Sequence, residues 1–429
     1  MKNFLFFLLA TLLLGASAYY TLHPAPSFTF TPASPKPQSS STPFALTSTL
    51  PMPATQSTPT ESIPAESTLV ESTAQTVEST ANIDHATPNT PALDSPEPSS
   101  HPSTRKLIAS AHSSTLASLG DGRILSAYFA GSREGASDVK IYGNILSQNR
   151  WGEAFEILSR QKLMRDAKEY IAKLGNPVLY RLDDTLHLFI VGASIGGWAT
   201  SKLYHYTASP KDLDFRFSQA LHLSPFLNIS TLARTQPLAI RFQEQRDAGQ
   251  SGLILPLYHE LATKYPLLLV LDSTGHITQI KKPNKIKGLL QPSITALSPT
   301  ESLLAFRAHK SADSILYTQL CDNRLHCSPP QATNLKNQDN SLNLFTLGNQ
   351  TYLLYNTPNE NLTRGKLSIA RLKSPTTFQW LTDIDATSTP KGEVSYPTAI
   401  ITDGQIHITY TLDRRAIRHK ALSTDYFGD

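Results

Sequence analysis

"GEVSYPTAIITDGQIHITYTLDRRAIRH", residues 392–419, is the stretch of this chain that indicates its fold. Apolar and polar residues alternate on both sides of Asp403-Gly404, a dipeptide typical of the tight turn of a β-hairpin. The stretch also has a Ser-Tyr-Pro start, a second tyrosine at Tyr410 and a basic cluster between 414 and 418. The edge of an ordinary sheet needs none of these, so we ask whether the unit recurs.

The same unit occurs six times along the chain. The five other copies are "HSSTLASLGDGRILSAYFAG" from His112, "NPVLYRLDDTLHLFIVG" from Asn176, "QPLAIRFQEQRDAGQSGLILPLY" from Gln236, "QPSITALSPTESLLAFRA" from Gln291 and "NSLNLFTLGNQTYLLYN" from Asn340. Successive starts lie about 50–65 residues apart, which leaves room for two more strands in each unit. This spacing predicts an all-β fold, a six-bladed β-propeller; a solenoid or a pair of sandwiches is the alternative.

Each unit begins with a polar residue, often followed by proline. Because the first strand of a propeller blade lies nearest the central axis, these polar starts should face one shared site. Helical periodicity is nearly absent, and "LMRDAKEYIAKL", residues 163–174, is the one amphipathic helix that we predict.

The first 104 residues differ in character from the rest. Residues 1–20 combine Lys2, an apolar run and small residues, which predicts an export signal or an uncleaved N-terminal membrane anchor. Residues 21–104 are dominated by Pro, Ser, Thr and Ala and hold too few apolar side chains to offset the entropy of ordering, so we predict a disordered linker. The folded domain is expected to be 105–429, outside the cytoplasm, whether periplasmic, at the cell surface or membrane-anchored.

Charge and cysteines narrow the class of function. Residues 105–429 hold 36 basic and 27 acidic residues, a net charge of +9, against +4 for the whole chain. This excess favours an anionic partner, but we see no nucleic-acid-binding pattern and expect none. Cys321 and Cys327, the only two cysteines, are separated by five residues and predict a local disulfide in an oxidising compartment. No cluster has the spacing of a metal site, and we expect no cofactor.

Taken in order, several segments resemble the BNR-repeat sialidase family over essentially all of 105–424. They are "HSSTL", "DGRILSAYFAGSREGASDVKIY", "ILPLYHE", "QPSI", "LLAFR", "LLYN", "RGKLSIA" and "VSYPTAII" with the hairpin that follows it. The Asp boxes of that family (Ser-x-Asp-x-Gly-x-x-Trp) are eroded in "SQNRWGEAF" (147–155), "SPKDLDFRFS" (209–218), "LDSTGHIT" (271–278) and "LKSPTTFQW" (372–380). The resemblance implies a sialidase-like hydrolase that binds an acidic glycan or sialoglycoconjugate.

Sialidases use a tyrosine nucleophile, because a carboxylate would be repelled by the carboxylate of sialic acid. The resemblance makes Tyr396 the nucleophile and Arg307 and Arg364 two of three arginines that hold the substrate carboxylate. It makes Asp138 the acid/base, with Glu134 as the competing residue.

Two positions depart from the family. His112 stands where the first arginine is expected, and a histidine cannot bind a carboxylate with paired donors as arginine does. Gln291 stands where the glutamate that activates the tyrosine is expected, and glutamine cannot accept a proton.

Further candidates for substrate binding lie at the ends of the predicted strands. They are Tyr258 and Glu260 in blade three, Asp339 and Asn340 at the start of blade five, and Arg414 after the last hairpin. Glu260 is also a candidate for a substitute base.

Three hypotheses remain open at the level of sequence. The first is an exported sialidase-like glycoside hydrolase acting on terminal acidic sugars. The second is a surface glycan-binding propeller that has lost catalysis. The third is a lyase on uronic-acid polymers, with His112 or a tyrosine as the proton abstractor. The sugar, its linkage and the oligomeric state do not follow from the sequence.

Overall fold

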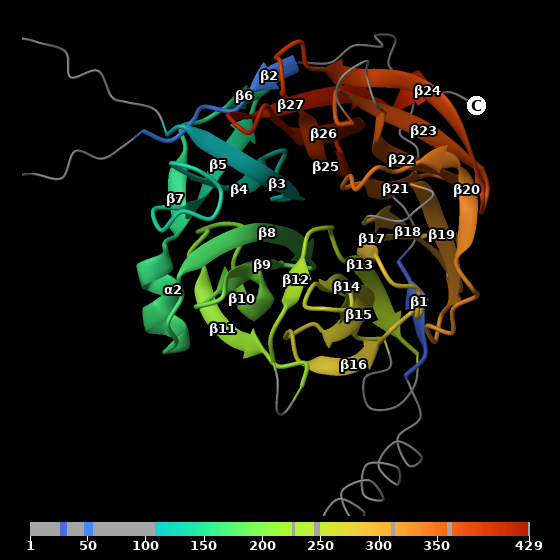
Figure 1. Cartoon of the computed structure of the whole chain (residues 1–429), viewed down its shortest axis with the longest axis horizontal. Coiled ribbons are helices and arrows are strands. Elements are labelled where there is room, and N and C mark those ends of the chain that lie inside the picture. The colour runs from blue at the N-terminus through green and yellow to red at the C-terminus, as the bar shows by residue number, and fades with distance from the viewer. Residues whose placement is uncertain are drawn as a thin grey trace, which may run out of the picture. The chain divides into compact units, whose positions relative to one another are not determined.

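The computed structural model describes residues 26–31, 47–54, 108–224, 228–243, 249–309, 314–357 and 363–427. These residues form six antiparallel sheets arranged around a common axis (Figure 1). The predicted all-β fold, a six-bladed propeller, is therefore confirmed.

Blades 1, 2, 4 and 5 are each built from consecutive strands. Blade 1 contains β3 (Ser110–Ser118), β4 (Ile124–Gly131), β5 (Lys140–Ser147), β6 (Arg150–Trp151) and β7 (Phe155–Leu158). Blade 2 contains β8 (Lys173–Leu182), β9 (Thr185–Ala193), β10 (Ser201–Ala208) and β11 (Arg216–Leu221). Blade 4 contains β17 (Leu289–Ala296), β18 (Glu301–Ala308), β19 (Ile315–Asp322) and β20 (Gln331–Lys336). Blade 5 contains β21 (Asn343–Leu347), β22 (Gln350–Thr357), β23 (Lys366–Ser374) and β24 (Thr377–Ala386).

Blades 3 and 6 each receive a strand from the N-terminal part of the chain. Blade 3 contains β12 (Thr231–Ala233), β13 (Leu238–Phe242), β14 (Ser251–His259), β15 (Tyr265–Asp272) and β16 (Ile277–Lys281), with β1 (Phe28–Phe30) paired to β13. Blade 6 contains β25 (Val394–Thr402), β26 (Gln405–Leu412) and β27 (Ala416–Ser423), with β2 (Thr47–Thr49) as its fourth strand.

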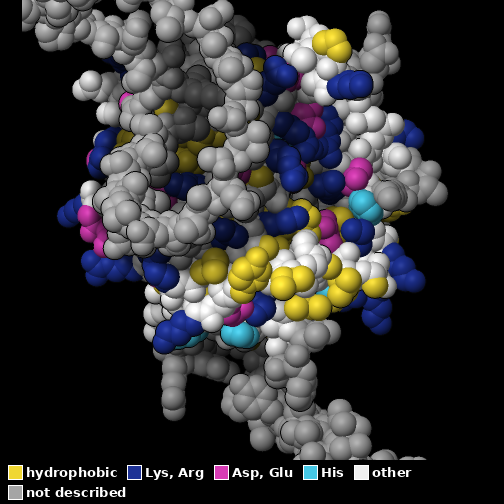
Figure 2. Space-filling view, turned by 60° about the vertical axis from the view of Figure 1, so that its left-hand side comes forward, with side chains coloured by type: hydrophobic (Ala, Val, Ile, Leu, Met, Phe, Trp, Pro, Cys, Tyr) yellow, Lys and Arg dark blue, Asp and Glu magenta, His cyan; other side chains and the backbone are white. Residues whose placement is uncertain are grey.

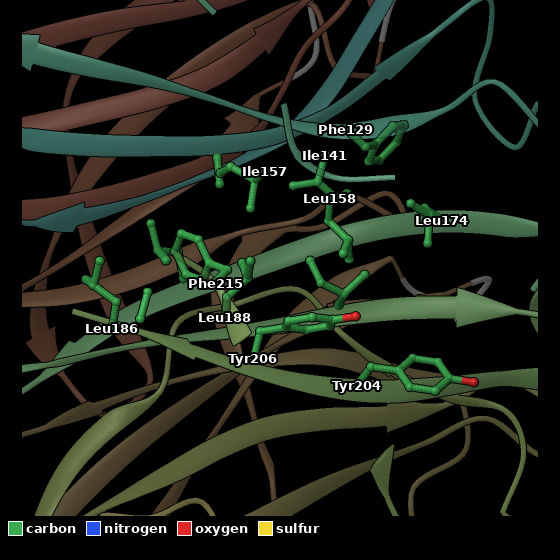
Figure 3. Close-up of a cluster of buried hydrophobic side chains, with 14 of the residues drawn as sticks. Phe129, Ile141, Ile157, Leu158, Leu174, Leu186, Leu188, Tyr204, Tyr206 and Phe215 are labelled. Carbon is green, nitrogen blue, oxygen red and sulfur yellow. The ribbon is translucent and has the colours of Figure 1, made fainter. Parts of the chain in front are cut away.

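The core lies between neighbouring blades. Alternation along each strand places apolar side chains on both faces of every sheet, so each sheet buries them against the next one. Figure 3 shows this for blades 1 and 2, where Phe129 and Ile141 of blade 1 face Leu188 and Tyr206 of blade 2. Similar clusters fill the other blade interfaces, so the ring is held together by apolar burial all the way round.

An α-helix lies between β7 and β8, and it is shorter than the sequence predicts. Helix α2 covers Arg160–Ala167, capped by the Ser159 hydroxyl, and ends where Lys168 adopts a left-handed conformation at φ 54°. The predicted helix at 163–174 is wrong at its C-terminal end, because residues from Lys173 onward pair with β9.

The N-terminal strands correct the prediction of a continuous disordered linker over 21–104. Phe28 and Phe30 of β1 are fully buried between blades 3 and 4, and their backbone N–H groups donate to Asn323 O and Pro299 O. Strand β2 pairs with β27, and Leu50 is buried against blade 1. Residues 1–25, which include the predicted export segment 1–20, lie outside the described residues, as do 32–46 and 55–107.

The same contacts close the ring between the last blade and the first. Leu50 N donates to Ile417 O of blade 6, and Pro51 O accepts from the Asn144 amide of blade 1. Ile108 N then donates to Pro53 O at 3.0 Å. Residues 53 and 108, which flank the Pro/Ser/Thr-rich stretch in the sequence, are therefore hydrogen-bonded to each other.

The turns between third and fourth strands retain part of the chemistry of an Asp box. Asp272 Oδ1 accepts from the backbone N–H groups of Thr274 and His276, inside the eroded box 271–278. Asp322 does the same for Arg324 and His326 in blade 4. A disulfide joins Cys321 and Cys327 across this second turn.

Candidate functional site

Four of the first strands, β3, β8, β17 and β25, share an irregularity that shapes the site. Their pairing with the second strand shifts register at the same place: between His112 and Thr115 in β3, Leu290 and Ser293 in β17, and Ser395 and Thr398 in β25, with a similar shift in β8. Such β-bulges bend a strand and redirect its side chains. Proline at the bulges of β8, β17 and β25 fits, because it has no N–H to contribute to the ladder.

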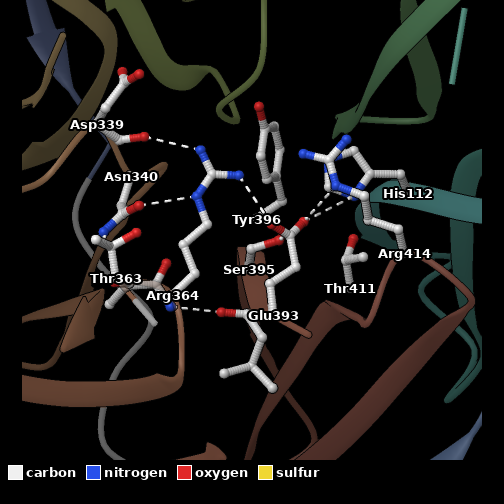
Figure 4. Close-up of polar contacts among 12 residues, drawn as sticks. His112, Asp339, Asn340, Thr363, Arg364, Glu393, Ser395, Tyr396, Thr411 and Arg414 are labelled. Atoms are coloured by element: carbon white, nitrogen blue, oxygen red, sulfur yellow. Dashed lines mark hydrogen bonds and ion pairs between the residues drawn. The ribbon is translucent and has the colours of Figure 1, made fainter. Parts of the chain in front are cut away.

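Tyr396 occupies the bulge of blade 6 in a left-handed conformation, with φ at +55°. This region is unfavourable for a bulky side chain and costs about 1–3 kcal/mol. The hydroxyl of Tyr396 accepts a hydrogen bond from Arg307 Nη1 at 3.3 Å. The Tyr396 ring contacts the His112 ring, with the two ring centroids 4.3 Å apart (Figure 4). The Arg364 guanidinium lies 5.9 Å from the centroid of the Tyr396 ring.

Arg307 is held by blade 5 as well as by Tyr396. Its Nε donates to Asp339 Oδ1 at 2.7 Å, and His309 lies 3.1 Å from the same oxygen. Burial disfavours the charge of Arg307, but its interactions with Tyr396 and Asp339 outweigh this and raise its pKa. Burial also disfavours the charged form of Asp339, yet the bond from Arg307 leaves the pKa of Asp339 below its ordinary value.

Arg364 and Arg414 meet at a residue that sequence reasoning missed, Glu393. Arg364 Nη1 donates to Glu393 Oε2 at 3.1 Å, and Arg414 Nε donates to Glu393 Oε1 at 3.0 Å (Figure 4). Arg364 also donates to Asn340 Oδ1 and to Asp339 O. Glu393 lies two residues before Ser395 in the opening stretch, and alternation along the strand was the signal that could have identified it.

His112 lies among these arginines as a neutral side chain. It is 2% exposed, and neither ring nitrogen has a hydrogen-bond partner among the described residues. Burial and then the charges of the surrounding arginines, Arg414 foremost, lower the pKa of His112 well below its usual range. It therefore offers at most one N–H donor where the resemblance implies an arginine.

Gln291 is turned toward Tyr258. Its Nε2 donates to the Tyr258 hydroxyl at 3.2 Å, and Gln291 itself has φ at +44°. Burial raises the pKa of Tyr258, with Glu260 and Tyr396 adding to the effect. Glu260 is partly buried, and its backbone N–H donates to the Ser230 hydroxyl.

The two acid/base candidates, Glu134 and Asp138, differ in whether they contact the arginines around Tyr396. Glu134 Oε2 pairs with Arg414 Nη1 and so belongs to the cluster. Asp138 is exposed, and both its carboxylate oxygens accept hydrogen bonds from Ser132 in its own loop. The structure thus joins Glu134 to the site through Arg414, while the role of Asp138 stays a prediction.

Arg234 is the second residue that sequence reasoning missed. The sequence places the start of blade 3 at Gln236, but the first strand of this blade is split into β12 and β13, and Arg234 lies in the break. Its guanidinium reaches blade 6, where it donates to Thr398 Oγ1 and Pro397 O and lies 5.0 Å from the ring centroid of Tyr396. A lone arginine in the apolar segment "STLAR" was the only signal in the sequence.

The opposite end of the first strands encloses a cavity of about 440 Å³. It is lined by residues from the first strands of all six blades, by Gln236 in the break between β12 and β13, and by Thr31 next to β1. Since none of the predicted site residues lines this cavity, we assign the candidate site to the polar cluster around Tyr396. Among the described residues, no group of His, Cys, Asp and Glu is arranged to hold a metal ion. Basic side chains, dark blue in Figure 2, are spread over the face shown there, in keeping with the net charge of 105–429.

Solved structures resemble this fold at low sequence identity. A protein of unknown function from Dyadobacter fermentans is 12% identical with a TM-score of 0.56, covering 74% of this chain and 95% of its own. Trypanosoma rangeli sialidase in complex with sialic acid is 10% identical with a TM-score of 0.53; the match covers 76% of this chain and 55%, about half, of the sialidase. Penicillium chrysogenum alpha-L-arabinanase complexed with arabinobiose is 12% identical with a TM-score of 0.51, covering 73% and 94%.

These likenesses show a fold that is shared with glycoside hydrolases. None of the curated proteins matches the chain by sequence. The model of the BNR repeat-like domain matches residues 122–408, which is more than half of the chain. The chain therefore belongs to the BNR repeat-like domain family.

Proposed function

We propose that this protein is a sialidase-like glycoside hydrolase that acts on a terminal acidic sugar of a glycan, with Tyr396 as its nucleophile. The observation that carries the proposal is the conformation and surroundings of Tyr396. A tyrosine is kept at φ +55° with its hydroxyl bonded to Arg307 and with two further arginines next to its ring. Strain of this kind persists where the surrounding structure enforces it, and functional sites are where it gathers.

The arginines supply the binding chemistry that an acidic sugar needs. The contacts of Arg307 and Arg364 leave some of their N–H donors without a partner among the described residues, and these donors match the two oxygens of a carboxylate. Asp339 and Glu393 hold the two guanidinium groups in place. The carboxylate of the sugar would then be bound beside the tyrosine that attacks the anomeric carbon.

The proton of Tyr396 is the weak point of this mechanism. Among the described residues, no carboxylate is hydrogen-bonded to the Tyr396 hydroxyl, and the amide of Gln291 is bonded to Tyr258 instead. Without a general base, the nucleophile loses a factor that contributes about 10²–10⁴ in rate. This observation favours a second candidate function, a glycan-binding propeller that holds an acidic sugar without hydrolysing it.

The lyase hypothesis has less support. A proton abstractor must accept a proton, and burial among arginines holds the pKa of His112 far below its usual value. A histidine in that state is a poor base at neutral pH.

We place the site of action outside the cytoplasm. The disulfide between Cys321 and Cys327 supports this, because such bonds persist in oxidising compartments. The apolar segment 1–20 is the expected export signal or anchor. No helix in the described part of the chain is long and apolar enough to span a bilayer.

The experiment should use a chain that keeps the two N-terminal strands, so residues 26–429 or longer. We would incubate it with fluorogenic sialosides, glucuronides and arabinofuranosides, with Tyr396→Phe as the matched control, and measure the binding of N-acetylneuraminate, glucuronate and galactose by calorimetry. Turnover of an acidic glycoside that is lost in Tyr396→Phe supports the hydrolase. Selective binding of an acidic sugar without turnover supports the second candidate, and binding of none of the sugars rejects both.

A further inference from the structure

Arg234 differs from the other arginines around Tyr396 because no carboxylate among the described residues is paired with it. It is 1% exposed, and its hydrogen bonds go to two neutral oxygens, Thr398 Oγ1 and Pro397 O, while Nε has no partner in the described part of the chain. Arg307, by contrast, is paired with Asp339, and Arg364 and Arg414 share Glu393.

Arg234 nevertheless carries a full charge at neutral pH. Burial lowers its pKa to about 10, which is still far above the pH of any ordinary compartment. Removing a guanidinium from water without an opposite charge is strongly unfavourable. The fold therefore keeps an uncompensated cation at the centre of the ring, where a well-packed apolar side chain would be more stable.

The neighbours of Arg234 point to a ligand. Thr398, which accepts from Arg234, donates in turn to Ser114 O, so the bulge of β3 lies against the same residue. On that bulge His112, Ser113 and Ser114 are fully buried, and their ring nitrogens and hydroxyls have no partner in the described part of the protein. Buried polar groups are almost always hydrogen-bonded, so unpartnered donors on a bulge that Thr398 links to an unpaired cation have the composition of an anion site.

We propose that Arg234 is the charged residue of a monoanion site beside Tyr396, with the donors of His112, Ser113 and Ser114 as its other members. The identity of the anion rests on the proposed function: it is the carboxylate of the acidic sugar. Arg234 from blade 3 then takes over the role that an arginine at position 112 would have had. A small inorganic anion such as chloride has the same charge and needs the same donors, so the experiment distinguishes the two sources.

The test measures melting temperature against anion concentration for the chain from residue 26 onward. Sodium N-acetylneuraminate and sodium chloride are titrated separately, at an ionic strength kept constant with a bulky sulfonate. A ligand that binds only the folded state raises its melting temperature progressively with concentration. The variants are Arg234→Met, Arg234→Lys and, as a control, Arg123→Met, whose arginine pairs with Asp121 at the surface.

We expect the wild type and Arg123→Met to respond to the anion and Arg234→Met to respond at least tenfold more weakly. Without anion, Arg234→Met should melt at or above the wild-type temperature, because the variant no longer buries an unpaired charge. Arg234→Lys should keep part of the response, which tests the proposal even if the methionine variant fails to fold. A response to the sugar alone identifies its carboxylate as the anion, and a response to both salts identifies a small anion.

Two results would overturn the inference: a wild type that responds to neither salt, or an undiminished response in both Arg234 variants. A lower melting temperature of Arg234→Met with the response intact would mean that Arg234 acts only in packing. Absence of glycoside turnover with an Arg234-dependent response would reject the hydrolase and support the anion site. Unchanged turnover and unchanged sugar affinity in Arg234→Met would reject the anion site and support the hydrolase.

Discussion

Closure of the ring by residues 47–54 makes a quantitative prediction about stability. Leu50 is 1% exposed and lies in the apolar cluster between blades 6 and 1, with Tyr128 and Ile417. Replacing a leucine at such a position by alanine removes its apolar contacts and leaves a cavity, which costs about 2–5 kcal/mol. Leu50→Ala should therefore lower the free energy of unfolding by this amount, although Leu50 comes from a stretch of sequence that looks unstructured.

Truncation should have a larger effect than the point variant. A chain that begins at Arg105 lacks the buried side chains of Phe28, Phe30 and Leu50. At about 1.5–3 kcal/mol for each side chain, the loss is about 4.5–9 kcal/mol. Because domains are stable by only about 5–15 kcal/mol, this chain should be largely unfolded or aggregated at 37 °C.

The assay is urea unfolding followed by tryptophan fluorescence, since Trp151 packs against the same cluster and reports on the junction directly. Leu261→Ala is the matched control, because Leu261 is 38% exposed and its truncation should change the free energy by about 0.5 kcal/mol or less. If Leu50→Ala unfolds at the same urea concentration as Leu261→Ala, residues 47–54 do not close the ring.

Three further predictions concern the site and the blades. Arg307→Lys should weaken binding of an acidic sugar at least tenfold in calorimetry, since an ammonium loses the paired geometry and a charged hydrogen bond contributes about 1.5–3 kcal/mol. The control is Arg216→Lys at an exposed arginine, which should leave the affinity unchanged. Equal effects of the two substitutions would contradict the assignment of Arg307 to the binding site. Gln291→Glu restores a group that can accept a proton and should raise the kcat for sialosides at least tenfold; a folded variant with unchanged kcat would speak against the tyrosine mechanism. His407 and His419 are hydrogen-bonded and buried, and desolvation lowers their pKa values to about 4 and about 3. Because the folded state favours the neutral rings, their contribution to stability is complete above about pH 6.5 and is lost as the pH falls toward 4. Unfolding in urea at pH 7.5 and 5.0 should show this loss of stability. The double substitution His407→Gln with His419→Gln should make the difference between the two pH values smaller.

The blades could be predicted from the sequence because their determinants are local. Alternation along the hairpins and turn signals such as Asp403-Gly404 act between residues that are near one another in the chain. The polar residue and proline that begin several units are likewise a local pattern, and they correspond to the bulges at Gln291 and Tyr396. The convergence of Arg307, Arg364 and Tyr396 followed from the order of the blades and from the family resemblance.

Only the tertiary structure decided the features that depend on partners far away in the chain. Strands β1 and β2 are only three residues long, too short to form on their own. They form because open edges and apolar surfaces of blades 3, 4 and 6 are brought together by the closed ring and pair with them. The C-terminal end of the predicted helix 163–174 is a strand for the same reason, since residues from Lys173 onward pair with β9. Arg234 contacts Tyr396 although 162 positions separate them in the sequence. Arg234 lies in the break between β12 and β13, which the repeat pattern does not predict. Period and turn chemistry are properties of neighbouring residues, whereas an unpaired buried charge or a closing strand is a property of the assembled ring.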